Sequence, residues 1–136
     1  MRSAANLAWA CIAALTAAGG AGLWLAETRA QQSHAETLAS HATGGDAQRA
    51  SAAIVHYGCS GCHQIPGIAS PSGHVGPDLT TLAQRVYVGG SLRNGGETIV
   101  RMIVNPRSVN PRSAMPATGI TEAEARDVAA YLLAQR

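Results

Sequence analysis

The pentapeptide Cys59-Ser60-Gly61-Cys62-His63 stands between a helical pattern and a long loop. It contains two of the three cysteines of the chain and one of its five histidines. Two thiols three residues apart lie on the same side of one helical turn, so both can bond to the same bound group. The imidazole that follows directly can contact this group as well. The pattern therefore predicts that this stretch holds a prosthetic group and that the fold is built around it.

The spacing C-x-x-C-H is the attachment signature of c-type haem. It predicts that Cys59 and Cys62 form thioethers with two vinyl groups on one edge of the porphyrin and that His63 ligates the iron. Three alternatives compete. A redox dithiol needs a βαβ context that this sequence lacks, and structural zinc needs a fourth ligand with metal-site spacing, which the other histidines do not offer. A plain disulfide stays open for an exported chain.

Composition divides the 136 residues into three parts. Residues 7–26 carry no charge and follow Arg2, which predicts a signal segment or membrane anchor over residues 1–26. The length of this run favours an uncleaved anchor. Residues 27–46 are small, polar and aperiodic, and they predict a flexible linker. Residues 47–136 form the folded domain, which is too small to build a large core without a staple or cofactor.

Helical periodicity is the main pattern within residues 47–136. Apolar residues at helical spacing predict helices over 46–58, 95–105 and 121–133, and each range begins with a capping or glycine signal. A shorter helix is expected within 79–88. No segment alternates between apolar and polar residues for long enough to predict a sheet. The prediction is an all-α fold whose long loops need something to fill the centre.

The stretch Val104–Pro116 reads VNPRSVNPRSAMP, with one pentapeptide repeated in tandem. Its three prolines predict a stiff loop with neither helix nor strand. Met115 ends this loop about fifty residues after His63, which is enough chain to reach the opposite face of an iron. We therefore predict Met115 as the second axial ligand and His74 as the alternative. Met102, on the apolar side of a predicted helix, is expected to pack in the core.

With these pieces in view, the sequence resembles a class I c-type cytochrome. The matching parts are a helix that leads into Cys59–His63, then Val75–Leu79, Ala114–Pro116 and the terminal DVAAYL. Together they span essentially all of residues 47–136. The resemblance implies three to four short helices wrapped around one covalent haem, preceded by the N-terminal apolar helix.

The resemblance also implies roles for particular residues. The Pro77 carbonyl would orient the imidazole of His63 through its other ring nitrogen. Leu79 would pack on the haem ring. Arg85 or Tyr87 would lie near a haem propionate.

A narrower likeness concerns the segments YGCSGCHQIPGI, VGPDL, RVYVGGSL and AMP. They are similar to cytochrome c domains associated with subunit II of haem–copper oxidases, although no copper-binding domain precedes them here. The implied function is a one-electron carrier of a respiratory chain, itself not an enzyme. Its donor would be a dehydrogenase or a cytochrome bc-type complex, and its acceptor a terminal oxidase. The alternative is a haem peroxidase-like or gas-sensing protein with a displaceable distal ligand.

The charged residues and the N-terminal segment limit which partners and which location are expected. All ten basic residues are arginine, and without lysine or many aromatics the chain shows no nucleic-acid signature. Five arginines fall within residues 85–112 beside a single acid, a pattern that indicates docking. The expected location is the bacterial inner membrane, with the N-terminal helix in the bilayer and the haem domain in the periplasm. A soluble periplasmic protein after signal cleavage is the alternative.

Overall fold

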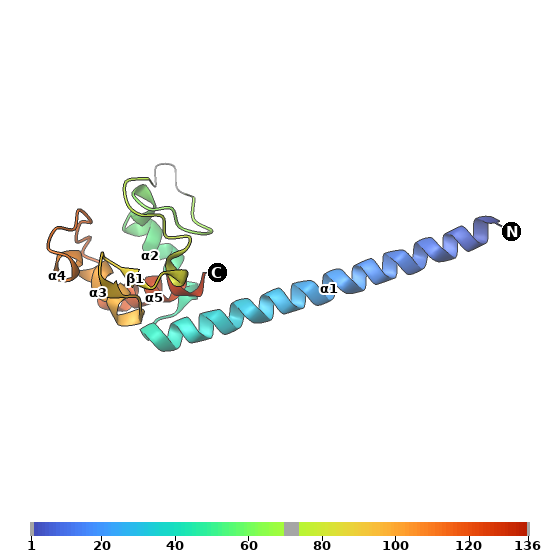
Figure 1. The fold of residues 1–136 in the computed structure, drawn as a ribbon, viewed down its shortest axis with the longest axis horizontal. Coiled ribbons are helices and arrows are strands. Elements are labelled where there is room, and N and C mark those ends of the chain that lie inside the picture. The colour runs from blue at the N-terminus through green and yellow to red at the C-terminus, as the bar shows by residue number, and fades with distance from the viewer. Residues whose placement is uncertain (1, 70–73, 136) are drawn as a thin grey trace. The chain divides into compact units, whose positions relative to one another are not determined.

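The computed structural model describes residues 2–69 and 74–135, without the side chains of residues 2–8 and 10–14. The chain divides into two compact units, Met1–His34 and Ala35–Arg136. Figure 1 shows the ribbon of both. Helix α1 (Arg2–Thr43) supplies the described part of the first unit and the first residues of the second.

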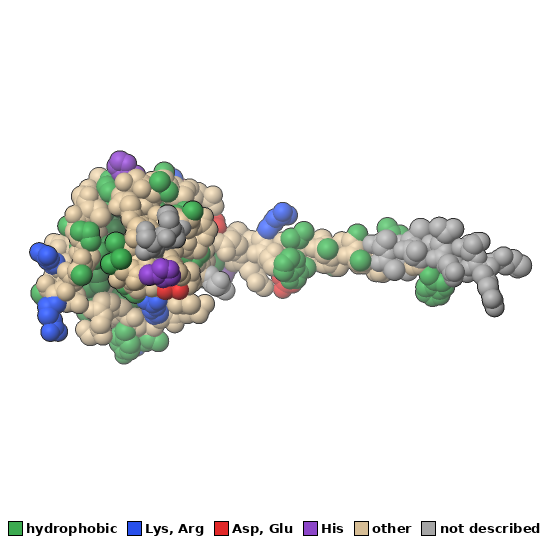
Figure 2. Space-filling view, turned by 90° about the horizontal axis from the view of Figure 1, so that it is seen from above, with side chains coloured by type: hydrophobic (Ala, Val, Ile, Leu, Met, Phe, Trp, Pro, Cys, Tyr) green, Lys and Arg blue, Asp and Glu red, His purple; other side chains and the backbone are tan. Residues whose placement is uncertain are grey.

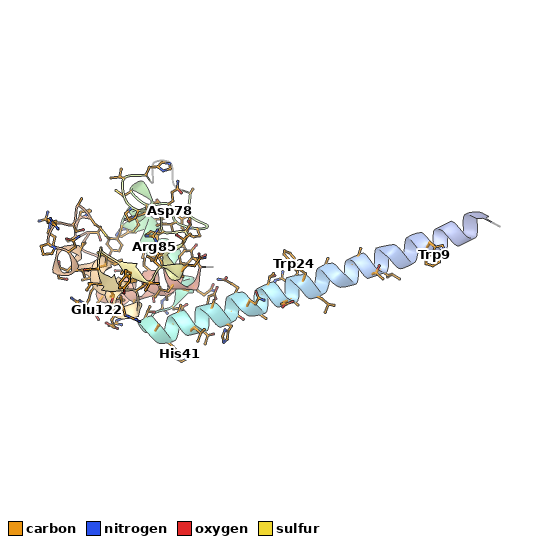
Figure 3. All side chains as sticks on the ribbon, viewed as in Figure 1. Trp9, Trp24, His41, Asp78, Arg85 and Glu122 are labelled. Atoms are coloured by element: carbon orange, nitrogen blue, oxygen red, sulfur yellow. The ribbon has the colours of Figure 1, made fainter. Side chains whose placement is uncertain are left out.

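In the described residues, the first unit consists of the part of α1 that precedes Ala35. Several large apolar side chains are exposed there, among them Trp9 and Trp24, which Figure 3 labels. No helix in the described part of the chain has an apolar stretch long enough to cross a membrane. The signal segment or membrane anchor over residues 1–26 stays a prediction.

The last turns of α1 belong to the second unit. The structure differs here from the flexible linker predicted over residues 27–46, because α1 continues to Thr43. Ala35, Ala39 and Thr43 are buried, and the Thr43 hydroxyl donates to the Ala39 carbonyl at 2.9 Å. The segment is rich in alanine, glutamate and glutamine, which have high helix propensity. Alanines spaced by four residues also give the helix a narrow side that packs closely.

The second unit places its C-terminal helix at the centre. Helix α5 (Glu122–Ala134) contacts α2 (Ala50–His56) and α3 (Gly96–Val104). The short elements are η1 (Ala47–Arg49), η2 (Cys59–Gly61), η3 (Leu82–Gln84), β1 (Tyr87–Val88), β2 (Leu92–Arg93) and α4 (Pro106–Val109). The buried core is formed mainly by the facing sides of α2, α3 and α5. The three predicted helices are confirmed, and the short helix expected within 79–88 is reduced to η3.

The helix ends follow the local signals of the sequence. The Asp46 side chain accepts from the Gln48 amide at 2.9 Å, and Gly58 stops the helical segment with φ 68°. At α5, Thr121 and Glu124 form a complete capping box. These caps set where the chain leaves each helix, and so they set where Cys59 begins.

A small hairpin was not predicted. Strands β1 and β2 pair antiparallel, with Tyr87 opposite Arg93 and Val88 opposite Leu92. Gly89 and Gly90 have φ values of 60° and 102°, a left-handed turn that glycine allows without strain. Strands of two residues are too short to show alternation, so periodicity could not reveal them. Apart from this hairpin, the described fold is all-α as expected.

The first copy of the repeated pentapeptide forms a helix, and the prediction of no helix in Val104–Pro116 is wrong. Asn105 caps α4 by accepting from the Ser108 amide at 3.3 Å. Pro106 occupies the first turn, where its fixed φ suits a helix and its missing N–H is not needed. Proline was therefore a helix start signal here rather than a helix breaker.

The second copy makes only a turn. The Asn110 side chain accepts from the Arg112 amide at 3.0 Å, and the Ser113 amide donates to the Asn110 carbonyl at 2.9 Å. Asn110 is extended, with φ −137° and ψ 107°, because Pro111 disfavours a helical residue before it. The two copies therefore give two consecutive turns, each begun by an asparagine side chain.

Candidate functional site

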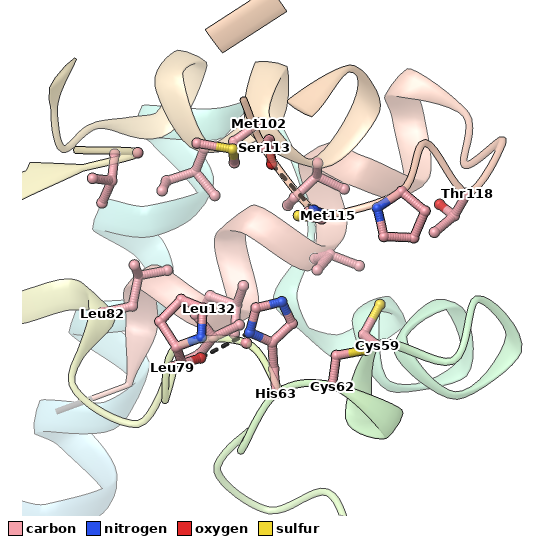
Figure 4. A pocket seen from close by; sticks show the side chains of 18 of the residues that line it. Cys59, Cys62, His63, Leu79, Leu82, Met102, Ser113, Met115, Thr118 and Leu132 are labelled. Carbon is pink, nitrogen blue, oxygen red and sulfur yellow. Dashed lines mark hydrogen bonds between the residues drawn. The ribbon is translucent and has the colours of Figure 1, made fainter. Parts of the chain in front are cut away.

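A cavity of about 460 Å³ opens in the second unit. Its walls come from α3, α5 and the loops that follow α2 and α4, and most of the lining side chains are apolar. Figure 4 shows this cavity. All the predicted site residues line it: Cys59, Cys62, His63, Pro77, Leu79 and Met115.

The two cysteines lie at one edge of the cavity (Figure 4). They belong to the tight turn η2, in which the Cys62 amide donates to the Cys59 carbonyl at 3.2 Å and the His63 amide to the same carbonyl at 3.0 Å. Both cysteines are free rather than joined as a disulfide. Burial raises the pKa of the Cys59 thiol, so this group is a neutral thiol at pH 7.

The imidazole of His63 is held by the main chain. Its Nδ1 lies 2.8 Å from the Pro77 carbonyl oxygen, the bond that the resemblance implied. A carbonyl only accepts, so Nδ1 carries the proton and donates. In the neutral imidazole with this tautomer, Nε2 is the nitrogen that can bind a metal.

Gly76 is a part of the site that sequence reasoning did not single out. A Cβ at this position would lie 2.4 Å from His63 Cε1 and 2.7 Å from Nδ1. The Gly76 amide also donates to the Cys62 carbonyl at 2.8 Å. The backbone therefore lies directly against the ring, an approach that only glycine permits. The available signal was a glycine directly before Pro77.

Met115 lies on the side of the cavity opposite His63 (Figure 4). Its amide donates to the Ser113 hydroxyl at 3.2 Å, and Pro116 follows it, so the backbone on both sides is restrained. His74, the alternative ligand, is not among the described residues that line the cavity. Its Nδ1 lies 3.3 Å from the side-chain nitrogen Nε2 of Gln64. The arrangement therefore presents Met115 rather than His74 to the cavity.

Met102 also lines the cavity wall, from α3. A Cβ on Gly89 would lie 2.6 Å from the Met102 methyl and 3.2 Å from a Val109 methyl. The Met102 methyl therefore lies against the turn of the hairpin. This placement agrees with a packing role, but Met102 packs in the wall of the cavity and not in the closed core.

The two residues implied for a propionate are placed differently. Arg85 lines the cavity and donates to the backbone carbonyl of Asp78, its neighbour in Figure 3. Hydrogen bonds from Thr80, and more weakly the charge of Arg85, hold the pKa of the Asp78 carboxyl below its usual value. Tyr87 is exposed on β1 and is not among the described lining residues.

The donor set fits a haem better than a bare metal ion. In the described part of the chain, no three His, Cys, Asp or Glu side chains gather as they would around zinc. One imidazole nitrogen and one thioether sulfur face each other instead, across an apolar space with two free thiols at its edge. An apolar macrocycle with an axially ligated iron matches this lining.

Comparison with known proteins leads to the same assignment. A protein-family model described as cytochrome c matches residues 47–136. Searches of curated proteins and of solved structures gave no match to the chain. The matched range covers most of the sequence. It contains every residue that lines the cavity, from Tyr57 to Leu132. The chain therefore belongs to the cytochrome c family.

Proposed function

We propose that this protein is a class I, monohaem carrier that passes single electrons along a respiratory chain, to or within a terminal oxidase. Membership of the family shows covalent haem c and electron transport in general. The observation that carries the finer proposal is the position of Met115 opposite His63 in one cavity. Two axial ligands leave no open position for a substrate, which favours electron transfer over catalysis.

Each site residue has one task in this proposal. Haem c supplies an iron that changes oxidation state by one electron. Cys59 and Cys62 would hold it through thioethers, and His63 Nε2 and Met115 Sδ would bind its iron. Pro77 keeps the proton on Nδ1, which fixes the ring orientation and increases the basicity of Nε2. Leu79 and the apolar wall exclude water, which favours the less charged reduced state.

The peroxidase-like or gas-sensing alternative requires Met115 to leave the distal side easily. The loop that carries Met115 is restrained by the Ser113 bond and by Pro116. Both restraints oppose displacement, so the geometry supports the carrier.

Replacing Met115 with alanine tests the distal ligand. We expect the variant to lose the weak near-infrared sulfur–iron band and to have a lower reduction potential, because a methionine ligand raises the potential. Visible and near-infrared spectroscopy of the oxidised protein, with a redox titration, measures both. Met102→Ala is the matched control and should keep the band. Loss of the band in Met102→Ala, with Met115→Ala unchanged, would show that the wrong methionine was assigned.

Replacing Gly76 with alanine tests the orientation of the proximal ring. The new Cβ would overlap His63, so we expect the imidazole to move away from Pro77 and the reduction potential to shift. Overpacking of this kind costs roughly 1–3 kcal/mol of stability. Gly61→Ala is the control, since a Cβ there meets nothing within 4 Å. Equal potentials in both variants, measured by redox titration, would exclude a positioning role for Gly76.

The location proposed for the haem domain is the bacterial periplasm. Covalent haem attachment takes place outside the cytoplasm, and the uncharged residues 7–26 after Arg2 have the composition of an export segment. Cell fractionation with the intact mass of the mature chain tests this. Recovery of the haem protein in the cytoplasmic fraction would contradict it.

The proposed partners are a dehydrogenase or cytochrome bc-type donor and a terminal oxidase as acceptor. Family membership supports redox partners in general, and the likeness to domains of oxidase subunit II supports the acceptor. Oxygen uptake by membranes lacking this chain, with and without added purified protein, tests it. Unchanged uptake in both would remove the oxidase from the proposal.

A further inference from the structure

Charges are unevenly distributed in the second unit. Two arginines are neutralised by ion pairs: Arg49 with Asp46 and Asp127, and Arg126 with Glu97 and Glu122. Across residues 2–69 and 74–135, no ion pair joins a carboxylate to the four exposed arginines Arg93, Arg101, Arg107 and Arg112. Figure 2 shows blue side chains at one edge of this unit with no red side chain beside them on the face drawn. An uncompensated positive field therefore lies over this part of the surface.

Three of these arginines come from segments that contact each other. Arg93 lies on β2 of the hairpin, and Arg107 and Arg112 lie on the repeated pentapeptides. The hairpin glycine Gly89 packs close to Val109, the first residue of the second copy. We call Arg93, Arg107 and Arg112 the arginine surface. Arg112 also lines the cavity, as Met115 does, and so this surface reaches the cavity at Arg112.

The repeat explains how two of these side chains are presented. In each copy the side chain of the asparagine accepts a hydrogen bond from a backbone amide, that of Ser108 in the first copy and that of Arg112 in the second. A proline follows each asparagine and fixes φ. Each arginine therefore projects from a stiff turn, so less backbone entropy is lost when its guanidinium is bound.

An apolar element adjoins the charges. Val86 and Tyr87 are 63% and 57% exposed, and Tyr87 is the cross-strand partner of Arg93. A small apolar area beside arginines is typical of protein interfaces, in which aromatic residues and arginine are enriched. Guanidinium groups also bind carboxylates with two parallel hydrogen bonds, which suits an acidic protein surface.

We propose that the arginine surface docks an acidic protein redox partner, and that the tandem repeat exists to present two guanidiniums beside the Met115 edge of the cavity. This inference rests on the proposed electron-transfer function, which requires a partner that can itself give or take an electron. An anionic lipid surface shares the negative charge but cannot do so, and it is treated as an outcome of the test.

The first experiment measures how the positive charge of the arginine surface affects the rate of reaction with an anionic reagent. The full-length holoprotein is reduced and then oxidised by anionic ferricyanide, and the rate is followed against ionic strength. Arg107→Gln should slow the reaction on the order of threefold at 10 mM ionic strength, where the Debye length is about 30 Å, and should have little effect at 1 M salt. Arg29→Gln removes the same charge from the first unit and should leave the rate nearly unchanged. Equal slowing by both variants would show that net charge alone acts, and would overturn the proposal.

The second experiment involves no electron transfer. Binding of poly-L-glutamate and of phosphatidylglycerol vesicles to the full-length holoprotein is measured by sedimentation at low salt. We expect poly-L-glutamate to bind and the Arg107→Gln/Arg112→Gln variant to bind it on the order of tenfold more weakly. Binding to vesicles alone, or equal binding of poly-L-glutamate by both proteins, would overturn the proposal. If the holoprotein exchanges no electrons with a redox partner, the electron-transfer function fails while this second result still decides the docking surface.

Discussion

Replacing Cys59 and Cys62 together with alanine is expected to abolish the covalent haem and the cooperative folding of the second unit. The cavity that these thiols border has a volume of about 460 Å³. An empty apolar cavity costs about 24 cal/mol per Å³, so a cavity of this size left unfilled would cost about 11 kcal/mol. That is comparable to the whole stability of a typical domain, about 5–15 kcal/mol. The helices α2, α3 and α5 therefore need the haem as part of their core.

Two measurements check this result. Haem staining of a denaturing gel should give a band for the wild-type chain and none for the double variant, and circular dichroism should show loss of the cooperative thermal transition. Each single cysteine variant should retain one thioether and an intermediate stability. Cys11→Ala is the matched control, since Cys11 lies outside residues 47–136, and it should keep both the stain and the transition. A double variant that unfolds with the wild-type midpoint would contradict the argument.

Much of the site could be predicted from the sequence because its signals are local. The order of Cys59, Cys62 and His63 is a fixed chemical pattern, and a cap at Asp46 with a stop at Gly58 sets where it begins. Met115 was identified by elimination among three methionines and by its distance along the chain, and it does line the cavity. The contact of Gly76 with the imidazole depends on two segments meeting in space, which a glycine in one sequence does not reveal.

The parts that sequence reasoning missed depend on tertiary contacts. The end of α1 was assigned to a linker because its alanines show no strong apolar face, yet close packing needs small residues rather than large ones. A Cβ on Gly96 would lie 1.9 Å from the Ala42 carbonyl oxygen, which shows how near α3 comes to α1. In the repeat, the prolines predict a break in the helix, but the Asn105 side chain caps α4 and makes Pro106 a helix start. A neighbouring backbone therefore decides the conformation in the first case, and a local side-chain cap decides it in the second.

The ion pair between Asp127 and Arg49 joins the two ends of the second unit. Asp127 is nearly buried on α5 and accepts from the Asp46 amide at 2.7 Å and from two guanidinium nitrogens of Arg49, each at 2.9 Å. The hydrogen bonds and charge of Arg49, with the bond from the Asp46 amide, hold the pKa of Asp127 below its usual value. Three hydrogen bonds to this one carboxylate therefore join α5 to the segment that leads into α2.

Asp127→Asn keeps the shape of the side chain but turns one of its oxygens into a donor that faces a guanidinium. Hydrogen bonds to charged groups contribute about 1.5–3 kcal/mol, so we expect a loss of about 2 kcal/mol in the free energy of unfolding at pH 7. That corresponds to a fall of about 10 °C in the melting temperature. The control is Glu122→Gln, whose carboxylate pairs with Arg126 and is 67% exposed. An exposed pair contributes at most about 1 kcal/mol, so the control should melt much closer to the wild-type protein.

The pH dependence separates this charge effect from a packing defect. The folded pKa of Asp127 lies below the unfolded value, which is about 3.9. Its contribution to stability is therefore fully present above the unfolded pKa and is lost as the pH falls through the folded pKa. The difference in unfolding free energy between wild-type and Asp127→Asn should stay constant from pH 7 to about pH 5 and shrink below about pH 4. Other carboxylates titrate in both proteins and cancel in this difference. Urea unfolding of the two holoproteins across this range measures it, and a difference that does not change with pH would mean that the lost charge is not the cause.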